Sequence, residues 1–204
     1  METGMNRILC IAAAAAILAG PALAGPTIRP PDTGPAQPGP PRPQQTFDST
    51  SDAEAKAEDL RLSGRCDLAV PILRHLSARS GYEISRYNLG ECLLTLADAD
   101  HDAAHAATLR HEAAGWILRA AGAGFAQAEA KAVTVCLDGV GTEKDPVEAE
   151  KWVLIYHHNG MRSVLNLPDI PDDVSDRLDA ALTNSARALA EARADAWAPT
   201  TRSD

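Results

Sequence analysis

The most constraining feature of this sequence is a glycine that recurs at a fixed distance after a bulky apolar residue. In three copies the glycine follows that residue by eight positions, and the copies are offset by 43 and 36 residues. Repetition at such a period is typical of stacked helical hairpins, because one hairpin cannot bury its apolar stripe alone. The pairs are Leu73 and Gly81, Trp116 and Gly124, and Trp152 and Gly160. Three residues before the bulky residue of each pair lie Val70, Ala113 and Ala149.

Between these positions the chain reads as helix almost without interruption. No segment alternates apolar and polar residues with the period of two that a half-buried strand needs. Breaks fall near Gly81, Gly124 and the Gly139-Val140-Gly141 run. After the first two breaks a second helix repeats its apolar positions, with Ser85, Leu89 and Leu93 matching Ala128, Ala132 and Cys136. We therefore expect an all-α fold, with helices at about 67–79, 82–98, 102–122, 125–138 and 145–159.

The best specified loop runs from Gly139 to Asp145. Gly139 and Gly141 allow the positive φ angles that let a chain leave a helix and turn. Asp145 is placed to cap the next helix, and Pro146 stands at the first helical position, where proline is well tolerated. Glu148 is predicted to complete a reciprocal cap.

Together these motifs resemble the Sel-1-like repeat, a family related to tetratricopeptide repeats. The clear match covers about 113–160, with a weaker copy at 67–98; Val133, Cys136 and Thr142 depart from the family pattern. The resemblance implies an α-solenoid of antiparallel helix pairs over residues 65–160, closed by N- and C-terminal capping helices. The residues expected to shape the repeats are Gly81, Gly90, Trp116, Ala120, Ala121, Gly124, Gly139, Gly141, Asp145, Ala149, Trp152 and Gly160.

The N-terminal 50 residues are predicted to lie outside this fold. Residues 1–24 have the pattern of a signal peptide: Arg7, an apolar run, and a small-residue site that predicts cleavage after Ala24. Residues 25–50 contain eight prolines between Pro26 and Pro43 and read as an extended linker. A periplasmic or secreted location follows, with no membrane span because the apolar run is short.

Capping helices are expected at both ends of the repeats. Over 51–64, Ser51 and Glu54 make a candidate capping box, and Gly64 ends the helix. Over 161–204, an irregular connection at 166–171 precedes one long helix, which opens at Asp172 and carries apolar residues as far as Trp197.

Three of the four cysteines lie after the predicted cleavage site: Cys66, Cys92 and Cys136. Disulfides persist in exported proteins, so one bridge and one free thiol is the natural arrangement. Cys66 and Cys92 are the expected pair, because they fall on consecutive helices that fold back near Gly81. The alternative is three buried thiols.

Charge and motifs exclude several classes of function. The formal net charge of −9 disfavours nucleic acid and anionic membrane surfaces as partners. No nucleophile elbow, zinc-protease motif or phosphate loop is present, so we predict no catalytic residues, cofactor or metal. The strongest candidate for a metal site is the group of His101, His105 and His111 with Glu112 and Asp98. His101 and His105 are four positions apart and would share one helix face, a spacing that can hold zinc. The alternative is that these residues form a solvated helix face. Cys136 is interpreted as a buried, inert thiol.

Function is expected to follow from the repeats. The resemblance implies an adaptor that docks a protein or peptide in the cell envelope on the concave face lined by the first helix of each pair. The predicted binding residues are Arg74, His75, Arg119, Lys151, Ile155 and His158, which suggest an acidic or carboxylate-bearing ligand. Alternatives from other classes are a cell-wall or β-lactam-related hydrolase and a secreted effector. The sequence does not indicate an oligomeric state.

Overall fold

A computed structural model of the protein describes residues 49–79 and 82–200. The predicted signal peptide (1–24), nearly all of the predicted linker (25–50) and Gly81 lie outside the described residues. Within them the fold is all-α, with no strand, as expected. The helices are α1 (Thr50–Leu62), α2 (Cys66–Ser77), α3 (Glu83–Ala99), α4 (Ala103–Gly122), α5 (Ala126–Asp138), α6 (Pro146–His158), α7 (Gly160–Val164), α8 (Asp172–Ala181) and α9 (Asn184–Asp195).

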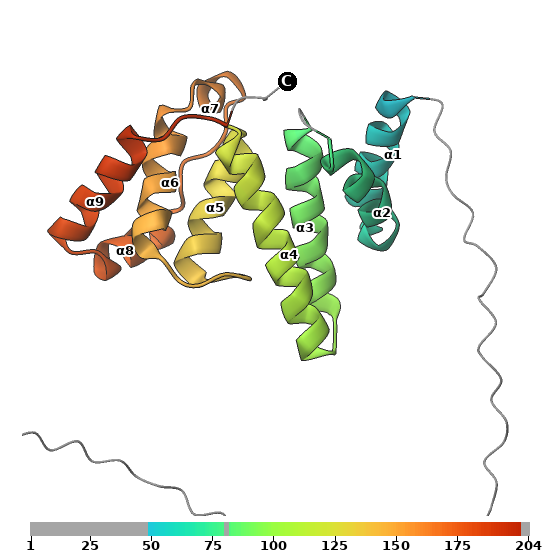
Figure 1. Ribbon diagram of the computed structural model, residues 1–204, viewed down its shortest axis with the longest axis horizontal. Helices are drawn as coiled ribbons and strands as arrows, with labels where there is room; N and C mark the ends of the chain where they lie inside the picture. Colours follow the sequence, from blue (N-terminus) through green and yellow to red (C-terminus); the bar gives the residue numbers. More distant parts are fainter. Residues whose placement is uncertain (1–48, 80–81, 201–204) are drawn as a thin grey trace, which may run out of the picture. The chain divides into compact units, whose positions relative to one another are not determined.

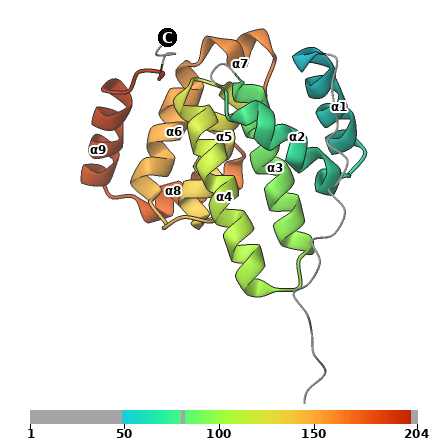
Figure 2. The same ribbon diagram turned by 45° about the vertical axis from the view of Figure 1, so that its right-hand side comes forward.

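The helices pack mainly on their neighbours in the chain. From α1 to α6, each helix contacts the next one, and α9 returns to pack against α6 (Figures 1 and 2). The apolar side chains form one large cluster over α1 to α4 and a second over α4 to α9. Ile117 and Val135, with Ala114, lie in a third, smaller cluster contributed by α4 and α5.

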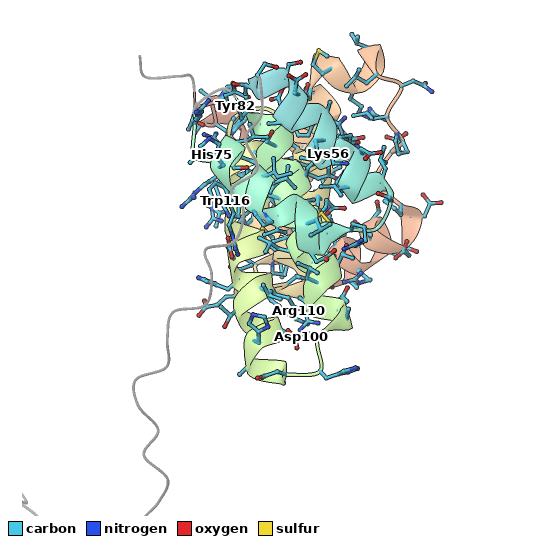
Figure 3. All side chains as sticks on the ribbon, turned by 90° about the vertical axis from the view of Figure 1, so that its right-hand side faces the viewer. Lys56, His75, Tyr82, Asp100, Arg110 and Trp116 are labelled. Carbon is cyan, nitrogen blue, oxygen red and sulfur yellow. A yellow bond between two sulfur atoms is a disulfide. The ribbon has the colours of Figure 1, made fainter. Side chains whose placement is uncertain are left out.

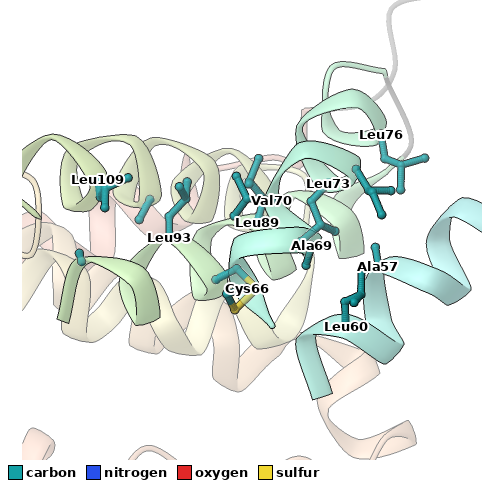
Figure 4. Close-up of a cluster of buried hydrophobic side chains, with 14 of the residues drawn as sticks. Ala57, Leu60, Cys66, Ala69, Val70, Leu73, Leu76, Leu89, Leu93 and Leu109 are labelled. Carbon is teal, nitrogen blue, oxygen red and sulfur yellow. A yellow bond between two sulfur atoms is a disulfide. The ribbon is translucent and has the colours of Figure 1, made fainter. Parts of the chain in front are cut away.

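Positions predicted to be equivalent in the repeats are buried in both hairpins. In the first hairpin Val70 lies beside Leu89, and α2 packs between α1 and α3 (Figure 4). The corresponding residues Ala113, Ala128, Ala132 and Cys136 are buried in the second hairpin. Among the anchors, Leu73 and Trp152 are buried, while Trp116 is half-buried. Most of the positions matched by the sequence period are therefore buried.

The first sequence offset is longer than the second because the helices that it spans are longer. Helix α3 has 17 residues and α4 has 20, whereas α5 and α6 have 13 each. The seven additional residues of the first offset amount to about two helical turns. They extend the α3–α4 hairpin, whose junction projects past the neighbouring helices in Figure 1. Asp102 caps α4 there by accepting hydrogen bonds from the amides of Ala104 and His105.

The loop from Gly139 to Asp145 has the predicted conformation. Gly139 and Gly141 have φ angles of 69° and 70°. A side chain at Gly141 would overlap the backbone of Arg110 in α4, so the turn lies tightly against the α4 helix of the second hairpin. Asp145 caps α6 by accepting from the amide of Glu148 at 2.9 Å. The reciprocal bond is absent: the Asp145 amide donates to the Cys136 carbonyl instead, at 2.9 Å.

Two expectations for the helix ends were wrong. The cap of α1 is Ser49, which accepts from the amide of Asp52, so the helix begins before the predicted Ser51 box. The predicted long C-terminal helix is two helices, because Thr183 caps α9 through the amide of Ala186. Gly160, expected to be one of the residues that shape the repeats, begins the short α7, which Asn159 caps.

Candidate functional site

Three of the predicted binding residues lie on exposed parts of α2 and α4. The guanidinium of Arg74 makes two hydrogen bonds, 2.9 and 2.6 Å long, to the carboxylate of Glu112. Arg119 lies over the ring of Trp116, 4.8 Å from its centroid. Figure 3 shows His75 and Trp116 on the same side of the helices. We call Arg74, His75, Trp116 and Arg119 the α2–α4 face.

The charge state of this face differs from the expectation. Glu112 neutralises Arg74, and the hydrogen bond from Arg74 lowers the pKa of Glu112. Glu112 also accepts from the Trp116 indole at 3.3 Å, which fixes the ring. Arg119 has no carboxylate partner within residues 49–79 and 82–200, so it is the cation left available to a ligand.

Lys151 and Ile155 are not on an open face, which corrects their predicted role. Lys151 is only 9% exposed to solvent and Ile155 only 5%, because α9 covers the α6 helix. The ammonium of Lys151 lies 3.9 Å from the centroid of the Trp152 ring and pairs with Glu148. Glu148 also pairs with Arg193 of α9, at 3.4 Å. Lys151 is therefore part of the α6–α9 packing.

Ile155 and His158 instead line a cavity of about 600 Å³ formed mainly by α6 and α9. We call it the α6–α9 cavity. His158 is exposed, and its Nδ1 donates to the carbonyl of Leu154 at 2.7 Å, which leaves Nε2 directed away from the helix backbone. The cavity has a volume typical of sites for small molecules or single side chains. Its other lining residues include Glu129, Asn159, Glu191, Asp195 and Trp197.

Glu129 is the most unusual residue of this cavity. It belongs to α5 and is fully buried. Its Oε2 accepts from Nδ2 of Asn159 at 2.8 Å, and the same amide donates to the Gly124 carbonyl at 3.1 Å. Its Oε1 has no hydrogen-bond partner in the described part of the chain. Burial raises the pKa of Glu129.

Sequence reasoning missed Glu129. It lies in an alanine-rich helix where an acidic residue usually faces solvent. The signal that could have identified it is its position around the helix. Glu129 directly follows the buried Ala128 and lies three and four residues before Ala132 and Val133, which are also buried. That spacing places it on the apolar stripe of α5.

The candidate histidine group does not assemble. His101 precedes the α4 cap, so it does not share a helix face with His105. His105 pairs with Asp100, and His111 donates to the Gly141 carbonyl at 2.9 Å. Glu112 is occupied by Arg74 and Trp116. Within the described ranges, no three His, Cys, Asp or Glu side chains are arranged to hold a metal.

The cysteines follow the predicted arrangement. Cys66 and Cys92 are at disulfide distance, with Cα atoms 5.0 Å apart, and they bond α2 to α3. Cys136 is free and buried. Burial raises its pKa to about 12, with the carboxylate of Glu148 adding to the effect. A thiol that holds its proton so tightly is a poor nucleophile at neutral pH.

In the part of the chain that the structure describes, no helix combines the length and apolar character needed to cross a bilayer. Comparisons of the chain with protein-family models, with curated proteins and with solved structures gave no match.

Proposed function

We propose that this protein is an exported scaffold of Sel-1-like repeats, stacked as an α-solenoid, that binds a protein or peptide partner through its α2–α4 face. The observation that supports the proposal is the burial, in both hairpins, of positions that the sequence predicts to be equivalent. Repeats of this kind form an extended concave binding surface, and the first helix of each pair is expected to line it. Helices α2 and α4 are the first helices of their pairs.

The chemistry of the α2–α4 face favours an acidic partner segment. Arg119 supplies a cation on an aromatic ring, and His75 lies within 3.4 Å of a second guanidinium, that of Arg79. Tryptophan, tyrosine and arginine are the residue types enriched at binding hot spots. A carboxylate of the partner can pair with Arg119 while an apolar group contacts Trp116.

Export is part of the proposal, and the Cys66–Cys92 bridge supports it. Disulfides are stable in oxidising compartments and rare in the cytosol. Mass spectrometry of the protein recovered from its native cells tests this point. A mature chain beginning at Gly25 is expected, and a chain that retains residues 1–24 in the cytosol would contradict export.

The binding proposal is tested by crosslinking a tagged copy in the native envelope and comparing variants. The Arg119→Glu, His75→Glu double variant is expected to lose at least three quarters of its crosslinks to a dominant partner. Lys144→Glu, an exposed change in the α5–α6 turn, is the matched control and should leave capture intact. Equal capture by all three proteins would contradict a role for this face.

A further inference from the structure

The α6–α9 cavity contains a buried carboxylate oxygen that the described chain leaves without a donor. The amide of Asn159 holds Oε2 of Glu129, while Oε1 has no partner. A buried carboxylate lacking donors is costly, and native structures rarely tolerate one without a bound group or water. Glu129 is completely buried and is one of the residues that line the cavity, so a donor bound there reaches Oε1 only when the residues around the carboxylate move apart.

Two further carboxylates line the same cavity from α9. Glu191 and Asp195 are exposed, and neither forms an ion pair within the described ranges. The nearby cations are already engaged: Lys151 with Glu148, Arg193 with Asp145 and Glu148, and Arg187 with Glu150 and Asp179. The cavity is therefore negative, although part of its wall was predicted to attract acidic ligands.

Apart from the polar side chains of His158 and Asn159, the remaining wall is apolar. Ile155 and Leu154 of α6 and Ala194 of α9 line it, together with Trp197. Trp197 packs edge-on against Trp152, with ring centroids 6.2 Å apart, which fixes its orientation. Such a wall suits a short chain of methylene groups, since long cationic side chains bury their stems on apolar surface.

We infer that the α6–α9 cavity binds a primary ammonium group carried on an alkyl chain, such as a lysine side chain, with the ammonium at Glu129. A metal ion does not fit, because no three ligands converge within residues 49–79 and 82–200. A guanidinium has five donors in a planar fork, more than a single free carboxylate oxygen can accept. This site is separate from the α2–α4 face and does not depend on the function proposed for it.

The test is a titration of the purified full-length chain with Nα-acetyl-lysine N-methylamide, followed through the indole N–H of Trp197 by NMR. A saturable shift is expected. The norleucine analogue, which has the same stem without the charge, is expected to give none, and the arginine analogue should bind at least fivefold more weakly.

The variants identify the residue responsible. Glu129→Gln keeps an acceptor for Asn159 but removes the charge, so lysine binding should weaken at least tenfold. Glu191→Gln combined with Asp195→Asn changes only exposed groups and should weaken binding about two- to fivefold. Glu143→Gln, an exposed glutamate in the α5–α6 turn, is the control and should bind as the parent does.

Several outcomes would overturn the inference. They are equal binding of the lysine and norleucine compounds, parent-like binding by Glu129→Gln, and no saturable shift with any compound. Because the probe is a defined small molecule, a negative result here leaves the crosslinking test of the α2–α4 face unaffected.

Discussion

The ammonium of Lys151 lies 3.9 Å from the centroid of the neighbouring Trp152 ring, beneath α9. A charge in this position is retained because Glu148 pairs with it and the indole face attracts it. The contact shows that Lys151, which was predicted to meet a ligand, instead stabilises the packing of α6.

Reversing this charge should destabilise the protein. Lys151→Glu places a buried carboxylate beside Glu148 and the indole face, so we expect the free energy of unfolding to fall by at least about 2 kcal/mol. Arg119→Glu removes the contact of a guanidinium with the Trp116 ring at an exposed site. This change should alter the free energy of unfolding by less than about 1 kcal/mol. Urea unfolding of both variants measures the difference. Equal losses would show that Lys151 is as open to solvent as Arg119.

The Cys66–Cys92 bridge closes a 26-residue span between α2 and α3. In the loop-entropy model a bridge of this span stabilises the folded state by about 3 kcal/mol. Replacing both cysteines by alanine should lower the free energy of unfolding by about that amount, as measured by urea unfolding without reductant. Adding reductant should destabilise the parent and leave the double variant unchanged. A parent that is insensitive to reductant would contradict a stabilising bridge.

Gly141 is expected to be intolerant of any side chain. It has a φ of 70°, and a Cβ there would overlap the backbone of Arg110. Gly141→Ala should therefore lower the free energy of unfolding by at least about 2 kcal/mol, combining left-handed strain with displacement of α4. Gly115→Ala is the matched control, since a Cβ at this α4 position meets no atom within 4 Å. That change should stabilise the protein by about 0.5 to 1 kcal/mol, because alanine favours helix.

Local signals in the sequence predicted much of this fold. The helices from α2 to α6 and the Gly139–Asp145 turn were predicted because glycine, proline and capping residues act over a few positions. The Cys66–Cys92 pair followed from the antiparallel packing of two consecutive helices. The contact of Trp197 with Trp152 joins residues far apart in sequence, and no local pattern indicates it. The α6–α9 cavity depends on that contact, so neither its position nor its charge was predicted.

The buried Glu129 should give the protein a distinctive dependence on pH. Burial raises its pKa above the ordinary value of 4.5, so the folded state keeps this proton to a higher pH than the unfolded state does. Between the two pKa values the unfolded chain binds fewer protons, and the free energy of unfolding falls as the pH rises. Glu129→Gln stays neutral throughout, so it should gain stability relative to the parent as the pH rises from about 4.5.

Glu112 provides the control of opposite sign. The hydrogen bond from Arg74 lowers its pKa, so the stability that its charge contributes is present above pH 4.5 and is lost as the pH falls through the lowered value. Glu112→Gln should therefore lose stability relative to the parent as the pH rises through this lower range. Urea unfolding of the three proteins between pH 3 and pH 8 gives both differences. Parallel curves for Glu129→Gln and the parent would mean that Glu129 is solvated when the protein is folded. If an ammonium ligand binds at Glu129, adding Nα-acetyl-lysine N-methylamide should raise the stability of the parent at neutral pH much more than that of Glu129→Gln, because the variant binds the compound more weakly.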